Sequence, residues 1–214
     1  MGYIEVDTLG NITRYSDIEL TDSITLNDDQ LCLLIKEHTS DYKFLNNDIV
    51  YRPKTSPYQA WDGTTWVYSQ ALVDNAKMEV WDKIKAYRDQ HKYKGIKVTV
   101  EGTEHWIHSD EASRIQHLGL LGAAILHVFR AFFNITQFEY FPTDLQWKTM
   151  VSDNMGNPIW LLMTWIVALQ IFAADMRLEA ACFAKAEYHR YHLMQSTDPY
   201  NYNYLEGWPA VFGS

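Results

Sequence analysis

Apolar residues recur at steps of three and four along three stretches of the chain, a spacing that places them on one side of a helix. The first stretch runs from about Gln70 to Lys92, the second starts after Ser109 or Asp110, and the third starts after Thr164. The side chains of Ser109, Asp110 and Thr164 can accept hydrogen bonds from the free N–H groups of a first helical turn. The pattern therefore predicts three long helices, the last two with N-caps at these positions.

The second predicted helix has an unusually apolar surface. One face is formed by Ile115, Leu118, Gly122, Ile125, Phe129 and Phe132. Leu121 and Val128 widen that face, so we expect this helix to lie at the centre of the fold with more than half of its surface buried. Gly119 and Gly122 indicate a place where another backbone can approach closely.

An apolar run of sixteen residues extends from Ile159 to Ala174. A bilayer-spanning helix needs about 20 such residues, and Thr164 and Gln170 interrupt this run. We interpret Ile159 to Met163 as a buried strand, Thr164 as a helix cap, and the remainder as the start of the third helix. This interpretation predicts no membrane insertion.

Two hairpins are predicted between the helices. The first joins Ile96–Val100 to Glu104–Ile107, and the second joins Leu145–Val151 to Ile159–Met163. In each pair, two strand-forming runs flank a short segment rich in Gly, Asp, Asn or Thr, which are typical turn residues. The chain after residue 70 is thus predicted to alternate helix, hairpin, helix, hairpin and helix.

The N-terminal part is predicted to be a small module rich in β-structure. Its expected hairpins are Tyr3–Val6 with Ile12–Tyr15, Phe44-Leu45 with Ile49–Tyr51, and a turn closed by Trp61 and Trp66. Asn27 and Gln30 form a capping pattern that predicts a helix from Asp28 to about Thr39.

These elements predict an α+β fold, with a small N-terminal β-rich module followed by a helical domain of three long helices separated by two β-hairpins. We expect the N-terminal module over residues 1–53 and a linker with a Trp-rich hairpin over residues 54–69. The helix-hairpin-helix-hairpin-helix domain is expected over residues 70–197, and an aromatic C-terminal tail over residues 198–214.

The charge of the chain argues against nucleic acid as a partner. The formal net charge is −9, and no run of four or more basic residues occurs, so the chain is poorly suited to phosphate backbones or anionic lipids. Its start lacks the basic and apolar regions of a secretory signal. Cys32 and Cys182 lie far apart among apolar neighbours, which favours free buried thiols.

Two groups of residues have spacings that could hold a metal ion: His105, His108 and Asp110, and Glu187, His189 and His192. Strand residues three apart point to opposite faces, and two ligands on one exposed helical turn make a weak site. No Gly-rich phosphate loop or paired-carboxylate motif is present. We therefore expect no metal, no cofactor, no catalytic residues and no enzymatic activity.

Aromatic residues make up 14% of the chain, including 8 Trp and 14 Tyr. Such residues are often found at interfaces, because each combines a large apolar face with a polar tip. In the C-terminal tail, the candidates for contact with a partner are Tyr200, Tyr202, Tyr204 and Trp208. The alternative is that these side chains pack on their own domain.

Short motifs follow one another in order: Tyr87-Arg88-Asp89, Trp106-Ile107-His108-Ser109-Asp110 with Arg114, Leu145-Gln146-Trp147-Lys148-Thr149, and Gly207-Trp208-Pro209. Through them, the segment from about Trp61 to Trp208 resembles an uncharacterised bacteriophage domain found in tail-fibre assembly proteins and other tail-associated proteins. The N-terminal module is similar only in style to the short β modules of such proteins.

The resemblance implies a tail-fibre assembly chaperone or a fibre-bound or tail-bound structural subunit, acting through protein contacts without chemistry. The implied partner is a tail-fibre or other tail protein, with a homo-oligomer as a further expectation. The implied location is the host cytoplasm during assembly, or the virion tail if the chain is retained there. Two alternatives remain open: a glycan-binding module on the virion surface, and a metal-dependent hydrolase built on the histidine groups.

Overall fold

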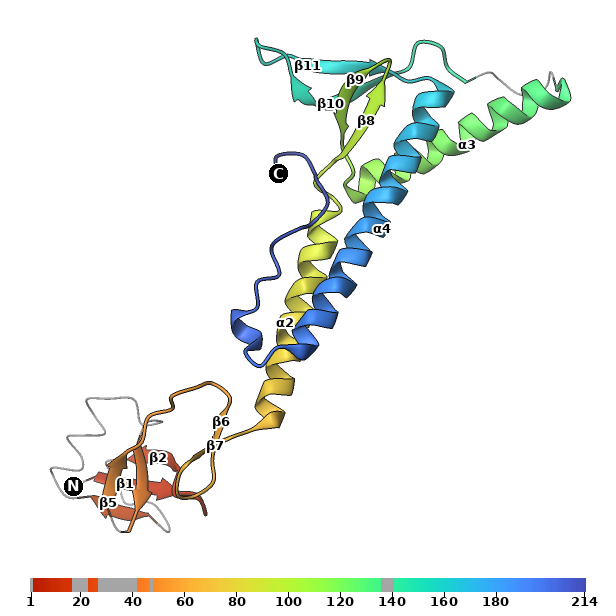
Figure 1. The fold of residues 1–214 in the computed structure, drawn as a ribbon. Coiled ribbons are helices and arrows are strands. Elements are labelled where there is room, and N and C mark those ends of the chain that lie inside the picture. Colours follow the sequence, from red (N-terminus) through yellow and green to blue (C-terminus); the bar gives the residue numbers. More distant parts are fainter. Residues whose placement is uncertain (1, 17–22, 27–41, 47, 136–140) are drawn as a thin grey trace. The chain divides into compact units, whose positions relative to one another are not determined.

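The computed structural model describes residues 2–16, 23–26, 42–46, 48–135 and 141–214 (Figure 1). The chain forms two compact units, Met1–Ala76 and Lys77–Ser214. The expected α+β class, with N-terminal strands and three later helices separated by hairpins, is confirmed. The predicted helix over Asp28–Thr39 lies outside the described residues, as does Cys32.

The first unit is built from short antiparallel strands. They are β1 (Gly2–Val6), β2 (Ile12–Ser16), β3 (Ile24–Leu26), β4 (Tyr42–Leu45), β5 (Asp48–Tyr51), β6 (Gln59–Trp61) and β7 (Trp66–Tyr68). The first three form one sheet in the order β2-β1-β3, and the others pair as hairpins. Ile4, Leu26 and Tyr42 form a small core in this unit. The three hairpins predicted from the sequence are therefore present.

The Trp-rich hairpin β6–β7 packs within the first unit. The indole N–H of Trp61 donates a hydrogen bond to the carbonyl of Leu9 at 2.7 Å. The ammonium of Lys43 lies 5.6 Å from the ring centre of Trp61 and 4.7 Å from that of Trp66. The predicted Trp-rich hairpin thus belongs to the first unit.

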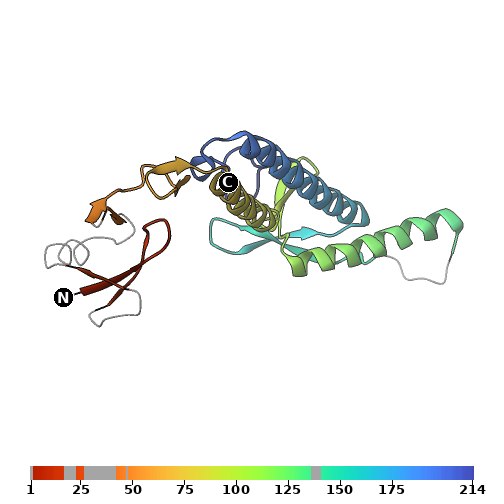
Figure 2. The same cartoon turned by 90° about the horizontal axis from the view of Figure 1, so that it is seen from below.

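The second unit contains the long helices and the two hairpins between them. Its elements are most of α2 (Gln70–His91), β8 (Ile96–Val100), β9 (Thr103–Ile107), α3 (Glu111–Phe133), β10 (Gln146–Ser152), β11 (Pro158–Leu162), α4 (Trp165–Gln195) and the short 3-10 helix η2 (Pro199–Asn201). Helices α2 and α4 run antiparallel side by side (Figures 1 and 2). Their contact is formed by Val80, Ile84, Ala186 and Leu193.

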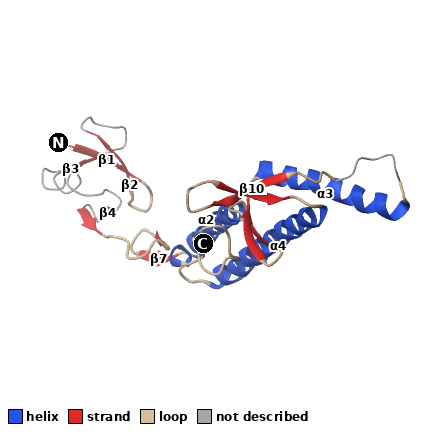
Figure 3. Cartoon of the chain, turned by 90° about the horizontal axis from the view of Figure 1, so that it is seen from above, coloured by secondary structure: helices blue, strands red, loops and turns tan. Residues whose placement is uncertain are grey.

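The main core lies where the two hairpins cover the first half of α4 (Figure 3). The apolar run there divides at Thr164 as predicted, because β11 ends before it and α4 begins after it. The expectation that the strand is buried is wrong, since only Leu161 is buried within β11. The Thr164 hydroxyl accepts a hydrogen bond from the backbone N–H of Val167 at 3.2 Å, which satisfies a free donor of the first turn. Asp110 caps α3 in the same way, through the N–H of Ser113 at 3.0 Å.

The expected central position of α3 is wrong. Only His117 and Ala124 are buried along this helix, whereas Ile115 is 66% and Phe132 is 81% exposed. Towards its C-terminal end α3 diverges from α4 (Figures 1 and 2). The periodic spacing identified an apolar face correctly but does not specify what covers it, and α3 packs on α4 through the opposite side.

The two glycines of α3 do not mark a close helix contact either. A Cβ atom at Gly119 or at Gly122 would meet no atom of the described residues within 4 Å. Both glycines therefore face open space, and the expectation of a closely approaching backbone within the fold is wrong.

Candidate interaction surface

The tail residues predicted to contact a partner are placed along α2 and α4. The hydroxyl of Tyr200 donates to a carboxylate oxygen of Glu79 at 3.0 Å. Tyr202, Tyr204 and Trp208 pack against the cluster that joins α2 to α4. The structure therefore gives three of the four residues an intramolecular packing role, and their contact with another protein stays a prediction.

His189 holds the tail onto α4 with both of its ring nitrogens. Its Nε2 lies 3.1 Å from the carbonyl oxygen of Glu206 and its Nδ1 lies 2.9 Å from the hydroxyl of Tyr202. A carbonyl only accepts, so Nε2 carries the proton and Nδ1 accepts from the tyrosine. Burial lowers the pKa of His189, which keeps the ring neutral and suited to both bonds.

Trp208 completes the attachment of the tail. Its ring stacks on His189 at a centroid distance of 5.6 Å and lies 5.1 Å from the ring of Tyr87. The carbonyl of Pro209 accepts a hydrogen bond from Nε2 of His91 at 2.8 Å. Residues of two sequence motifs, around Tyr87 and around Trp208, thus meet in one aromatic cluster.

The two histidine groups considered for metal binding do not converge. No group of three metal-ligating side chains occurs within the part of the chain that the structure describes. In the second group, both ring nitrogens of His189 already face partners in the tail. In the first, both carboxylate oxygens of Asp110 accept hydrogen bonds from Ser113.

Ser109 has a structural role next to these histidines. Its hydroxyl donates to the carbonyl of Lys92 at 3.1 Å and accepts from the N–H of Gly95 at 2.9 Å. This side chain therefore joins the end of α2 to the start of α3.

A buried ionic network between α3 and α4 was missed by the sequence interpretation. Asp175 lies 2.6 Å from Nδ1 of His117 and 3.7 Å from the guanidinium of Arg114. Arg114 also reaches Glu179 at 2.9 Å, and Lys92 lies 3.5 Å from the same carboxylate. The signal available in the sequence was the presence of single polar residues, such as Asp175, among the apolar positions of a predicted helix.

This network joins α3 to α4 and to the residue that follows α2. His117 is almost fully buried, its ring lies 5.7 Å from that of Trp147, and its Nε2 has no hydrogen-bond partner among the described residues. Cys182 is also fully buried, and burial raises its pKa to about 11, so the thiol is free but unreactive.

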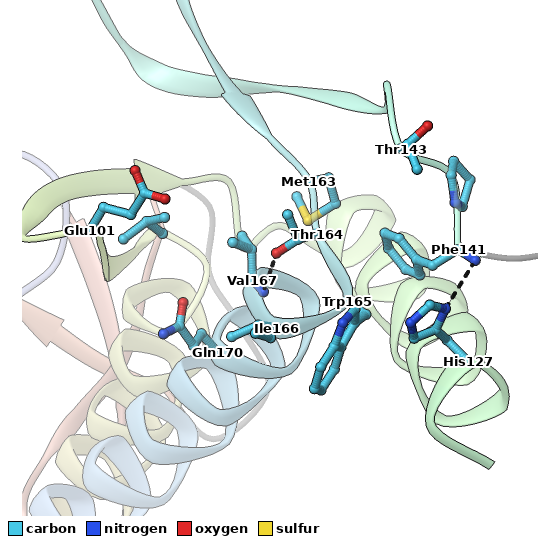
Figure 4. Close-up of a pocket in the computed structure, with 12 residues that line it drawn as sticks. Glu101, His127, Phe141, Thr143, Met163, Thr164, Trp165, Ile166, Val167 and Gln170 are labelled. Atoms are coloured by element: carbon cyan, nitrogen blue, oxygen red, sulfur yellow. Dashed lines mark hydrogen bonds between the residues drawn. The ribbon is translucent and has the colours of Figure 1, made fainter. Parts of the chain in front are cut away.

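A cavity of about 560 Å³ lies at the N-terminal end of α4 (Figure 4). Its wall includes Met163 and Trp165 on either side of the Thr164 cap, Phe141 from the segment between α3 and β10, and Val100 from the β8–β9 hairpin. His127 of α3 stacks on Trp165 at a centroid distance of 5.8 Å and accepts a hydrogen bond from the N–H of Phe141 at 3.4 Å. The cavity is thus mostly apolar.

The cavity has the chemistry of a binding pocket for an apolar group. Its size lies in the range of about 300–1,000 Å³ that ligand pockets occupy. Seven of its twelve lining residues are apolar, and one of the polar residues, Thr164, is used as the cap of α4. Glu101 and Gln170 lie on one side of it, away from His127 (Figure 4). We find no nucleophile paired with a base in its described wall.

Strand β11 leads directly into this cavity. It pairs with β10 and with no other described strand, so its outer edge is unpaired. Trp160 and Leu162 on this strand are 54% and 50% exposed, whereas Leu161 between them is buried. An unpaired edge with apolar side chains beside it is a template on which another chain can add a strand.

Most other described tryptophans are engaged within the fold. Trp66 has the ammonium groups of Lys43 and Lys54 within 5 Å of its ring centre, at 4.7 and 4.9 Å. Trp106 packs against Phe212 at 5.9 Å, and Trp208 packs against the tail cluster. The stacking surfaces that a glycan-binding module would need are therefore largely occupied by side chains of the protein itself.

Comparisons with known proteins found no match: no family model, no curated protein and no solved structure is similar to the chain.

Within the described residues, one helix, α3, is long and apolar enough to cross a membrane by length and composition. The mean hydropathy of its most apolar window is 1.3, and 11% of that window is buried.

Proposed function

We propose that this protein is a non-enzymatic assembly subunit of a bacteriophage tail, which binds an extended segment of a tail-fibre or other tail polypeptide. The supporting observation is that β11 has an unpaired edge and ends at the apolar cavity beside Trp165. The resemblance of the sequence motifs to tail-associated proteins supports the identity of the partner.

In the proposed mechanism the partner segment adds to β11 as a further strand. Main-chain hydrogen bonds along the edge supply affinity, and the exposed side chains of Trp160 and Leu162 cover apolar residues of the partner. An apolar side chain at the end of the segment enters the cavity lined by Met163 and Phe141. Covering such a segment keeps a fibre chain from pairing with wrong strand edges before its trimer forms.

The proposal is tested by replacing Trp160 and Leu162 together by Ser and measuring binding to tail proteins by co-purification from infected cells. We expect at least tenfold less tail polypeptide bound, because aromatic anchors dominate such interfaces. The matched control is Met155→Ser, at the tip of the same hairpin, which is highly exposed but lies away from the β11 edge. Equal recovery with both variants, or recovery of no tail protein by the native chain, would contradict the proposal.

A further inference from the structure

One face of α3 exposes a continuous line of apolar positions. We call this line the α3 seam, and it consists of Ile115, Leu118, Gly122, Ile125, Phe129 and Phe132. All six of these residues are exposed in the described structure. Next to it, an apolar hollow of about 330 Å³ is lined by Val128, Phe129, Phe132 and Phe133.

The spacing of the α3 seam is that of a coiled coil. Its positions alternate between steps of three and four residues, which is the spacing of the a and d positions in a heptad repeat with a period of 3.5 residues. That period keeps one face of a helix in continuous contact with a second helix that winds around it, whereas a period of 3.6 suits a helix packed in a globular core. The α3 seam therefore fits a partner helix.

The rest of the second unit prevents α3 from acting as a membrane span. The inner side of the helix is held to α4 by Arg114, His117 and Ala124. Helix α3 stays in contact with α4 as far as His127, which stacks on Trp165, and the six residues from Val128 to Phe133 extend about 9 Å. A bilayer core is about 30 Å thick, so insertion would require the buried pair His117–Asp175 to separate.

The exposed apolar area is close to what a stable dimer requires. Phe129, Phe132 and Phe133 are 55%, 81% and 57% exposed, and together they expose about 400 Å² of apolar surface. About 300 Å² more comes from the aliphatic residues of this face, at the burial values typical of such side chains: Ile115, Leu118, Ile125, Leu126 and Val128. A standard interface covers about 800 Å² on each partner.

The charges around the α3 seam favour a second copy of the same chain. The whole protein has a net charge of −9, but between Ile115 and Phe133 the helix contains no acidic residue. Its only fully charged residue in that range is Arg130, which lies beside the α3 seam and not in it. Identical helices can therefore meet along this face without like-charge repulsion, and nothing there selects a partner of opposite charge.

We propose that two copies of this protein associate through the α3 seam as an antiparallel helix pair. In this register Ile115 of one copy faces Phe132 of the other, Leu118 faces Phe129, and Gly122 faces Ile125. Each layer combines a larger and a smaller side chain, and the arrangement is symmetric about a two-fold axis, as isologous interfaces are. A parallel pair would leave a void between two Gly122 residues and place aromatic rings against each other.

The hollow beside Phe129 gives this register a physical basis. In the antiparallel pair, Leu118 of the second copy meets the face formed by Phe129, Phe132 and Val128. Gly122 has no neighbouring atom within 4 Å of its Cβ direction, so the side chain of Ile125 from the second copy has room there. This is the knob-into-hole packing of coiled coils.

The self-association is tested by sedimentation equilibrium at micromolar concentration with the native chain, Phe129→Glu and Phe132→Glu. We expect the native chain to be dimeric and each variant to dissociate at least 100-fold more readily, because a carboxylate would be buried without a partner. The matched control is Ala131→Glu, which adds the same charge at an exposed position outside the α3 seam and should remain dimeric.

Monomeric behaviour of the native chain would overturn the proposal, as would association that occurs only in the presence of phosphatidylcholine vesicles. Unchanged dimers of both Phe variants would overturn it as well. Far-ultraviolet circular dichroism of each variant shows whether it is folded, and Phe132 is the safer substitution because it is 81% exposed.

The orientation is tested by disulfide formation in a chain where Cys32 is replaced by Ser. We expect Leu118→Cys and Phe129→Cys to cross-link when the two variants are mixed, and neither to cross-link alone. Cross-linking of Leu118→Cys with itself would instead show a parallel pair and overturn the proposed register. Cys182 is fully buried and does not compete.

The dimer does not depend on the proposed tail partner. Replacement of Trp160 and Leu162 should leave the native dimer intact, and Phe129→Glu should still bind tail polypeptide through β11. A native chain that dimerises but recovers no tail polypeptide would contradict the proposed function alone, and a native chain that binds tail polypeptide as a monomer would contradict the dimer alone.

Discussion

Asp175 shows how a single polar residue can organise a helix interface. It is almost fully buried and lies between His117 and Arg114, both of which belong to α3. A buried carboxylate without such partners would be costly. The contact therefore fixes which side of α3 faces α4, and it leaves the α3 seam on the outside.

Replacing Asp175 by Asn should destabilise the protein by about 2–3 kcal/mol, because it leaves the buried charge of Arg114 with less compensation. The measurement is the free energy of unfolding in urea. Asp82→Asn serves as a control, since its ion pair with Lys85 is exposed and should contribute less than about 1 kcal/mol. Equal effects of the two substitutions would show that the Asp175 network is not a stabilising contact.

The neutral state of His189 predicts a pH dependence of stability. Its pKa is lowered in the folded state, mainly by burial, with Lys185 and His192 acting in the same direction and the hydrogen bond to Glu206 opposing them. The unfolded chain therefore binds a proton on His189 more readily than the folded chain does. The stabilisation that the neutral ring gives is complete above the ordinary pKa near 6.5 and is lost as the pH falls below it.

We expect the free energy of unfolding to decrease between pH 7.5 and pH 5.5 by up to about 1.4 kcal/mol per pH unit for this one group. His189→Gln should flatten that dependence, which thermal unfolding at both pH values can measure. An equal slope in the native chain and in the variant would assign the pH dependence to other groups.

Local sequence patterns predicted the helix caps better than they predicted the buried contacts. Thr164 and Asp110 precede apolar runs and were predictable as N-caps, because a cap is a local interaction. The pair of His117 with Asp175 joins residues 58 apart in the sequence, and no local pattern specifies such a contact. The same reason explains why the role of the tail aromatics could not be decided from their composition.

Helix α3 shows what periodicity alone can and cannot predict. The sequence placed Ile115, Leu118 and Phe129 on one face correctly, and α3 begins where expected. The direction of the face was wrong, because Ala124 and His117 on the other side make the contact with α4. A small residue and a buried ion pair allow a closer approach of two helices than large apolar side chains do.

The hairpin β8–β9 provides a matched test of two glycines. Gly95 precedes β8 with φ of +109°, and Gly102 lies in the turn with φ of +81°. A Cβ at Gly95 would overlap the sulfur of Met150, whereas one at Gly102 would meet nothing within 4 Å. We expect Gly102→Ala to cost about 1 kcal/mol and Gly95→Ala about 3 kcal/mol in urea unfolding. Equal costs would show that the neighbouring methionine moves freely.

The whole molecule follows the predicted order of elements, and the α+β class was predictable from their local patterns. The division into two units was less predictable from the sequence, because the boundary between Met1–Ala76 and Lys77–Ser214 falls within α2 and not at a proline-rich linker. The contacts of the β6–β7 hairpin with Leu9 and Lys43 are long-range, and the sequence around Pro53 gives no sign of them.

A chain that starts at Gln70 should fold without the first unit, because the two large cores of the second unit contain only residues after Lys77. We expect its urea unfolding midpoint to stay close to that of the corresponding transition in the full chain. Tryptophan fluorescence and circular dichroism can measure both. Aggregation or loss of the cooperative transition would show that the first unit is needed for the stability of the second.

The attachment of the tail to α2 has a consequence for how the chain acquires its structure. His91 bonds to the carbonyl of Pro209, 118 residues later, and Lys77 reaches the carbonyl of Met194, 117 residues later. During synthesis α2 therefore emerges long before the residues that cover its apolar side. Such distant contacts slow folding, and nascent chains of this protein should depend on chaperones of the translating cell until α4 is complete.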